Sequence, residues 1–163
     1  YSTGSTHLLS AILTKASGKN TLALAREWFR PLDDFRIGAW DRDPQGIYLG
    51  GNQMAMTARS LLAFGELYRN GGVTPSGDRL VSQGWIDQSW TQRTNSVFNG
   101  DGYGYCWFMR DMAGEKTNYI FGVGGETDFT VHSRMSTVGM IVRGGAAASR
   151  NVVRCRASGR LYI

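Results

Sequence analysis

Hydrophobic residues in the first part of the chain recur with the spacing of α-helices. The clearest run places apolar residues within one helical turn of each other, at Leu8, Leu9, Ile12 and Leu13. This spacing predicts a helix over residues 5–17, which Gly18 can end because glycine readily adopts a left-handed backbone conformation. A second helical stretch is expected over residues 21–28.

Two further helices are expected, and each begins after a residue whose side chain can cap it. Thr57 caps a helix that runs through Tyr68 and stops at Asn70-Gly71-Gly72. Ser82 caps a shorter helix that carries three large apolar residues, Trp85, Ile86 and Trp90. Residues 35–51 mix glycine, aspartate and proline, which predicts a long loop that can border a site.

From Tyr103 onward the pattern changes to the alternation typical of β-strands. Residues 103–109 alternate as one strand, after a turn-rich connection at residues 95–102. Further β-prone runs lie at residues 119–121, 129–132 and 138–142, and Glu115-Lys116 and residues 133–136 supply hairpin loops. Helices followed by a meander of three or four antiparallel strands predict an α+β fold.

The charge is unevenly distributed over the three regions that this order predicts: a mostly helical region 1–102, antiparallel strands at 103–145 and a basic tail at 146–163. The formal net charge is +5, yet no acidic residue follows Asp128, whereas six arginines do. The other 12 of the 18 basic side chains are matched by 13 acidic ones. We therefore expect a solvated tail and no nucleic-acid partner, because no basic groove interleaved with aromatic residues is present.

The sequence favours neither a metal site nor a cofactor. Cys106 and Cys155 form no CxxC pair, and His7 and His132 stand far apart. The glycines at 122–125 lack the spacing of a complete G-x-G-x-x-G motif, which disfavours a nucleotide cofactor. No apolar stretch approaches the ~20 residues that span a bilayer, so no membrane span is expected. The sequence leaves the compartment open between periplasm and cytoplasm, and it does not define the oligomeric state.

Two motifs that carry a nucleophilic serine are missing from the chain. There is no G-x-S-x-G elbow. There is also no S-x-x-K, because the residue three positions before each lysine, Lys15, Lys19 or Lys116, is isoleucine or alanine.

Three stretches, taken in order, nevertheless resemble one family. Tyr1-Ser2-Thr3 and the helix after it resemble a Y-x-N or Y-x-S motif. Gly50-Gly51 and residues 57–72 resemble its G-G, T-x-R-D, F-G-x-L-Y and N-G-G stretch. Residues 103–107 and 121–125 resemble its Y-G-Y-x-W strand and the G-x-G-G strand that replaces K-T-G. Over roughly residues 1–145 the chain is similar to class C β-lactamases, related esterases and 6-aminohexanoate-dimer hydrolases of the serine β-lactamase and penicillin-binding-protein-like family.

This resemblance implies part of a β-lactamase/transpeptidase-like fold and a serine hydrolase that forms an acyl-enzyme. Tyr1 matches the tyrosine that, with a lysine, removes and returns the proton of the nucleophilic serine. Thr3 stands where the family has Asn or Ser, and its hydroxyl can bond the lysine or the substrate. Gly124 and Gly125 match the strand whose backbone N–H helps to hold the oxyanion, and Gly122 matches the position of the lactamase Lys or His.

The departures from the family pattern narrow the expected substrate. An uncharged Gly122 removes the group that grips a substrate carboxylate, and Thr3 has less reach than an amide, so a small-molecule ester or amide is expected rather than a penicillin. The serine and lysine of S-x-x-K are expected upstream of Tyr1, which leaves the fold incomplete at its N-terminus and this chain alone inactive. The alternatives are a D-amino-acid peptidase or lactamase, and a catalytically silent penicillin-binding-like module that binds peptide or protein.

The remaining aromatic and histidine residues are interpreted as structural. Four aromatic side chains that can line a pocket, Trp40, Tyr48, Trp107 and Phe121, are interpreted first as core residues. His7 and His132 are interpreted as packed or exposed histidines.

Overall fold

The computed structural model describes residues 2–112, 115–121, 127–132, 137–142 and 151–156. They form helices and antiparallel strands, which confirms the α+β class expected from the sequence. The chain divides into two compact units, residues 1–63 and 64–163, and the division falls inside helix α3 (Ala58–Arg69).

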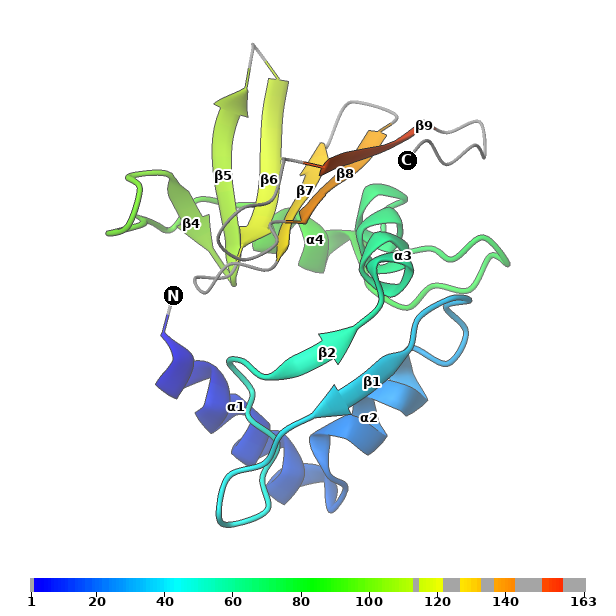
Figure 1. Cartoon of the computed structure of the whole chain (residues 1–163), viewed down its shortest axis with the longest axis vertical. Coiled ribbons are helices and arrows are strands. Elements are labelled where there is room, and N and C mark those ends of the chain that lie inside the picture. The colour runs from blue at the N-terminus through cyan, green and yellow to red at the C-terminus, as the bar shows by residue number, and fades with distance from the viewer. Residues whose placement is uncertain (1, 113–114, 122–126, 133–136, 143–150, 157–163) are drawn as a thin grey trace. The chain divides into compact units, whose positions relative to one another are not determined.

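The first unit combines two helices with a two-stranded sheet (Figure 1). Its elements are α1 (Thr3–Ser17), α2 (Thr21–Trp28), β1 (Ile37–Trp40) and β2 (Met54–Met56), followed by the start of α3. Helix α2 contacts both α1 and β1. Leu24, Leu32, Ile37 and Tyr48 are buried in this unit.

Capping residues account for the bounds of the helices. Ser2 accepts a hydrogen bond from the Ser5 N–H, and Gly18 ends α1 in a left-handed conformation with φ of 68°. Thr57 accepts from the Ser60 N–H at the start of α3, and Ser82 accepts from the Trp85 N–H at the start of α4 (Gln83–Ser89). The predictions of all four helices are thus confirmed, with Trp90 as the C-cap of α4.

The prediction of an uninterrupted loop at residues 35–51 is wrong for its first part. Residues 37–40 form β1, which pairs antiparallel with β2 through an irregular register between Ile37 and Ala39. Gly38 and Ala39 are exposed, so the strand has no alternation of apolar and polar side chains to reveal it. It forms because residues 54–56, distant in sequence, supply its hydrogen-bonding partner.

The second unit contains the rest of α3, then α4 and a seven-stranded antiparallel meander among the described residues. The strands are β3 (Thr94–Asn95), β4 (Gly102–Gly104), β5 (Trp107–Met112), β6 (Glu115–Phe121), β7 (Thr127–His132), β8 (Thr137–Val142) and β9 (Asn151–Arg156). Sequence neighbours are also neighbours in the sheet. The buried apolar side chains of this unit include Leu67, Tyr68, Ile86, Trp107 and Phe108.

Two strand predictions and part of the tail prediction need correction. Residues 103–109 are a hairpin and not one strand, because β4 pairs with β5 around the turn Tyr105-Cys106. Glu115 and Lys116 are not loop residues: they belong to β6 and pair with Met112 and Asp111. Residues 151–156 of the predicted tail form β9, which pairs with β8.

Candidate functional site

Thr3, one of the five predicted site residues, lies in the first turn of α1 against Gly51, and Gly50 packs on Thr6 of the same helix. The Thr3 carbonyl accepts a hydrogen bond of 3.0 Å from Thr6 Oγ1. A Cβ atom at Gly50 would lie 2.9 Å from the Thr6 carbonyl carbon and closer still to its oxygen, and one at Gly51 would lie 2.7 Å from Thr3 Cγ2. Only glycine fits there, which explains why the G-G stretch accompanies the Tyr-x-Thr stretch in one unit.

His7, on α1, forms hydrogen bonds with the loop that precedes Gly51. Its Nε2 lies 3.0 Å from Asp43 Oδ2, and the Gly50 N–H points at Nδ1 from 3.5 Å. Because the Gly50 N–H donates to Nδ1, Nε2 carries the proton and donates to Asp43. The interpretation of His7 as a packed histidine is therefore extended: it fixes residues 43–50 beside the turn that holds Thr3.

The Asp43 carboxylate is the centre of this attachment. Its Oδ1 accepts from the N–H groups of Gln45 (2.9 Å) and Ile47 (2.8 Å). Burial by itself raises the pKa of Asp43, but the backbone N–H of Ile47, the His7 ring and the backbone N–H of Gln45 outweigh it and hold that pKa below its ordinary value. The Asp-Pro-Gln-Gly sequence at 43–46 is typical of such a turn and is the signal that could have revealed it.

The other predicted site residues, Tyr1, Gly122, Gly124 and Gly125, lie outside the described residues. Among the five predicted site residues, the described geometry covers Thr3 and what packs on it. The strand that leads to Gly122 is described, however. The pairing of Phe108 with Tyr119 puts the C-terminal end of β6 at the same end of the sheet as the β4–β5 turn.

That turn presents an aromatic side chain in a constrained conformation. Tyr105 and Cys106 both have positive φ, 41° and 71°, as in a type I′ hairpin turn, although neither is glycine or asparagine. The Tyr105 ring stacks on Trp85 with centroids 5.2 Å apart and planes 8° apart. The Arg93 guanidinium lies over the same ring at 4.3 Å. Trp85 and Tyr105 are about half exposed, so this stack of two rings and a guanidinium lies at the surface of the sheet end.

A second polar cluster fixes the loop before β4. Arg110 donates to Asp101 Oδ2 through Nε (2.8 Å) and Nη2 (2.5 Å), and the Tyr119 hydroxyl donates to the same oxygen. Asn99 donates to Asp101 Oδ2 (3.1 Å) and to the Tyr119 hydroxyl (2.8 Å). No spacing in the sequence marks this cluster, because its members come from a loop and two strands.

The residues of this cluster shift one another's pKa values. Burial opposes ionisation of Asp101, but Arg110 and then Tyr119 outweigh it and lower the Asp101 pKa. Burial, followed by the hydrogen bond and charge of Asp101, raises the pKa of Tyr119 to about 12. We interpret the cluster as a structural support, because Oδ2 of its carboxylate already accepts from three side chains, Asn99, Arg110 and Tyr119.

Three of the four aromatic residues that could line a pocket are packing residues. Trp107 is 4% exposed and packs its ring against Tyr68 with centroids 4.9 Å apart. Trp40 and Tyr48 pack together at 5.4 Å, and Trp40 Nε1 donates to the Leu49 carbonyl. The interpretation of these three as structural is confirmed. The Phe121 side chain lies outside the described part.

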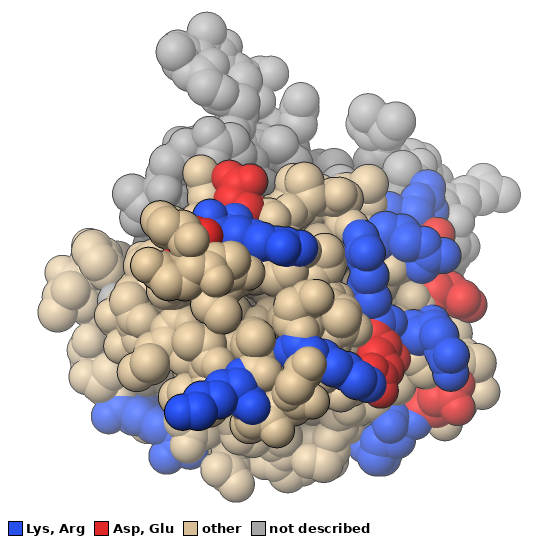
Figure 2. All heavy atoms as spheres, turned by 90° about the horizontal axis from the view of Figure 1, so that it is seen from below, with Lys and Arg blue, Asp and Glu red and all other residues tan. Residues whose placement is uncertain are grey.

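Basic side chains are interspersed with acidic ones in the described part of the chain. On the face drawn in Figure 2, Lys and Arg are scattered between uncharged residues and lie beside Asp or Glu at several points. Ion pairs among the described residues include Lys19–Glu27, Arg59–Asp34, Arg69–Glu66 and Arg110–Asp101. No group of three potential metal ligands occurs within the described ranges. None of the helices described there is both long and apolar enough to cross a bilayer.

Comparison with known proteins gives one distant similarity to a hydrolase. No protein-family model matches the chain. Over 104 residues, 63% of its length, the chain is 28% identical to a 6-aminohexanoate-dimer hydrolase from Paenarthrobacter ureafaciens. The match covers 26% of that hydrolase. The chain is thus distantly similar to about one quarter of a hydrolase, one of the protein types that its motifs resemble.

Proposed function

We propose that the chain is part of a β-lactamase-like serine hydrolase that cleaves esters or amides through an acyl-enzyme. The distant similarity to a named hydrolase supports this proposal at the level of hydrolase. The ordered motifs from Tyr1 to Gly125 support the serine mechanism, in which the S-x-x-K serine and lysine lie outside these 163 residues.

In this mechanism the serine Oγ attacks the substrate carbonyl carbon while its proton passes to the phenolate oxygen of Tyr1, which the positive charge of the lysine keeps ionised. The tetrahedral oxyanion is held by backbone N–H groups, one of them from the Gly124-Gly125 segment. Tyr1 then returns the proton to the leaving oxygen or nitrogen, and the bond to the leaving group breaks. Water attacks the acyl-enzyme in the second half of the reaction, and the serine recovers its proton.

The packing of Gly50 and Gly51 against the first turn of α1 is the observation that carries the proposal. Two stretches that are distant in the sequence, and that both belong to the resemblance, pack together: Gly50 lies against the Thr6 backbone carbonyl, and Gly51 lies against Thr3 and the Thr6 side chain. The glycine pair and the His7–Asp43 bond fix the turn that follows Tyr1. A tyrosine that must exchange a proton at a fixed distance needs such a fixed backbone.

Active-site labelling tests the proposal. A fluorophosphonate probe should leave the 163-residue chain unlabelled and should label a longer polypeptide containing it at one serine outside these residues, as located by peptide mass spectrometry. A stoichiometric adduct on a serine of this chain would contradict the proposal. Failure of the longer polypeptide to label would favour the catalytically silent binding module.

Tyr1→Phe in the labelling-competent polypeptide tests the assigned role. Removal of the hydroxyl should lower kcat for a chromogenic ester by about 10²–10⁴-fold, as expected for a positioned acid or base. Tyr162→Phe, beyond the region of resemblance, is the matched control. Near-normal acylation and deacylation rates in Tyr1→Phe would remove Tyr1 from the mechanism.

A further inference from the structure

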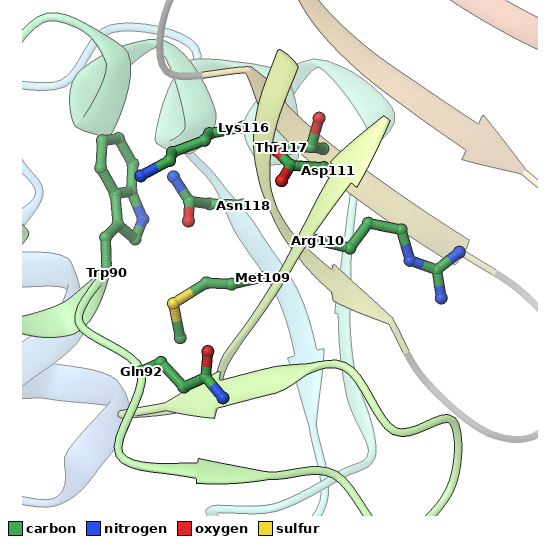
Figure 3. Close-up of a pocket in the computed structure, with 8 residues that line it drawn as sticks. All are labelled: Trp90, Gln92, Met109, Arg110, Asp111, Lys116, Thr117 and Asn118. Carbon is green, nitrogen blue, oxygen red and sulfur yellow. The ribbon is translucent and has the colours of Figure 1, made fainter. Parts of the chain in front are cut away.

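A pocket of about 280 Å³ lies on one face of the β5–β6 pair (Figure 3). Two cross-strand pairs floor it, Met109 opposite Asn118 and Asp111 opposite Lys116. These residues lie on the same face because side chains alternate along each strand. Trp90, the C-cap of α4, forms a wall.

The Trp90 indole offers this pocket a hydrogen bond. Its Nε1 is buried and has no acceptor among the described residues. Figure 3 shows this nitrogen on the ring edge turned toward Asn118. The ring is held by Tyr68 (centroids 6.1 Å apart) and by Trp107 in an edge-on contact at 5.9 Å. A buried donor without an acceptor is rare in proteins, because it has lost its hydrogen bond to water.

Asn118 supplies the complementary group. It is 7% exposed, and within the described residues its carboxamide makes no hydrogen bond to another side chain or to the backbone. The amide offers an acceptor and two donors. Trp90 and Asn118 thus form a pair of polar groups with unused hydrogen-bonding capacity, over the apolar side chain of Met109.

The charges around the pocket favour an uncharged ligand. Asp111 and Lys116 lie opposite each other and carry opposite charges. Arg110 points its guanidinium at Asp101. A carboxylate is attracted by Lys116 but repelled by Asp111, and an ammonium group is attracted by Asp111 but repelled by Lys116, so the pair as a whole favours neither charge. An ammonium group also has no lone pair with which to accept from the indole N–H.

We propose that this pocket binds a small uncharged carboxamide that carries an alkyl chain. The ligand carbonyl accepts from Trp90 Nε1, its N–H donates to the Asn118 side-chain oxygen, and its alkyl chain lies over Met109. The pocket lies beside the N-terminal part of β6, whereas Gly122 follows the other end of that strand. The inference therefore stands independently of the proposed hydrolase mechanism.

Ligand binding to the full 163-residue chain tests this proposal, with hexanamide, hexanoate and hexylamine as probes. Titrations followed by chemical-shift changes of the indole N–H signals should show saturable binding of hexanamide, at least about tenfold tighter than the acid or the amine. Equal affinity for the three probes, or no binding of hexanamide, would overturn the proposal.

Variants locate the site. Trp90→Phe removes the indole N–H and should weaken hexanamide binding about tenfold, as should Asn118→Leu, which removes the carboxamide. Trp28→Phe replaces an exposed indole of the first unit and should bind as the parent chain does. If Trp90→Phe does not fold, as judged by its circular dichroism, the affinity of Asn118→Leu for hexanamide is the test of the site. Unchanged affinity in a folded variant of either position would refute the assignment.

Discussion

Each unit holds a loop in place with one carboxylate, but the two carboxylates have different partners. Asp43 in the first unit accepts from two backbone N–H groups and the His7 ring. Asp101 in the second unit accepts from the Arg110 guanidinium and the Tyr119 hydroxyl. The pKa of each carboxyl is lowered, so the direction of the shift alone does not distinguish the two arrangements.

The difference lies in what each arrangement needs in order to form. The backbone donors around Asp43 are in place only when residues 43–50 adopt their folded turn, which in turn packs on α1 through Gly50. The Asp101 cluster joins side chains of a loop and two strands and depends on the charge of Arg110. The first attachment should therefore respond most to backbone changes, and the second to changes in charge.

Gly50→Ala should have the largest effect. Its Cβ would lie 2.9 Å from the Thr6 carbonyl carbon and closer still to the oxygen, backbone atoms that move only if α1 moves. We expect a loss of about 3 kcal/mol in the free energy of unfolding, at the upper end for overpacking. Hydrogen exchange should increase in α1 and in residues 41–51.

Gly84→Ala is the matched control, because no atom lies within 4 Å of its Cβ position in α4. There the alanine should stabilise the helix by about 0.5–1 kcal/mol. Equal effects of the two substitutions on urea unfolding would show that Gly50 is not selected by close packing.

Local signals allowed the helices of both units to be predicted, whereas the pairing of short strands escaped prediction. Ser2, Gly18, Thr57 and Ser82 cap helices through atoms close in sequence, so the sequence contains the whole interaction. The strand β1 exists only through its distant partner β2. The β4–β5 hairpin was missed because its turn residues, Tyr105 and Cys106, lack the glycine or asparagine that marks such turns.

The apolar periodicity of α1 predicted a helix correctly but not which face is buried. Leu8, Leu9 and Ile12 are between 51% and 60% exposed, whereas Ser10 is 2% exposed and donates to the Tyr48 carbonyl. Among the predicted site residues, Thr3 lies beside Gly51, one of the two glycines of the G-G stretch. The assembly of Tyr1 with Gly122, Gly124 and Gly125 remains a prediction.

Asp101→Asn tests whether the attachment in the second unit depends on the charge of Asp101. An amide cannot match the ionic hydrogen bond to Arg110, so we expect a loss of about 1–2 kcal/mol in the free energy of unfolding. The expected loss is modest because the Arg110 side chain is 40% exposed, although that of Asp101 is only 12% exposed. Asp111→Asn, on the strand beside Arg110, removes the same charge and should change stability little.

Asp43→Asn should cost less than Asp101→Asn. The asparagine oxygen can still accept from the N–H groups of Gln45 and Ile47, so the turn keeps its backbone donors. The bond to His7 Nε2 is lost. We expect a smaller change in Tm than Asp101→Asn produces, because the partner lost is the His7 ring N–H and not a guanidinium. A larger change in Tm for Asp43→Asn than for Asp101→Asn would show that the first attachment depends more on charge than the second.

The alkaline titration of Tyr119 should have the smallest effect on stability. At neutral pH the tyrosine is uncharged in both the folded and the unfolded chain, so its raised pKa does not make the stability depend on pH there. Its pKa is raised to about 12 in the folded chain, against about 10 for an unfolded tyrosine. The stability linked to Tyr119 is therefore fully present below pH about 10 and is lost as the pH rises through about 12. The lowered pKa of Asp101 acts at the other limit, where its stability is lost as the pH falls below the ordinary aspartate range.

Ultraviolet difference absorbance between the parent chain and Tyr119→Phe isolates this one tyrosinate. It should titrate near pH 12, and Asp101→Asn should move it back toward 10, because the Asp101 charge and hydrogen bond are removed. Asp43→Asn should leave the Tyr119 titration unchanged, since Asp43 shares no hydrogen bond with that cluster. A Tyr119 that titrates near 10 in the parent chain would show that its hydroxyl is not bound to Asp101. The attachment of Asp101 would then rest on Arg110 and Asn99 alone.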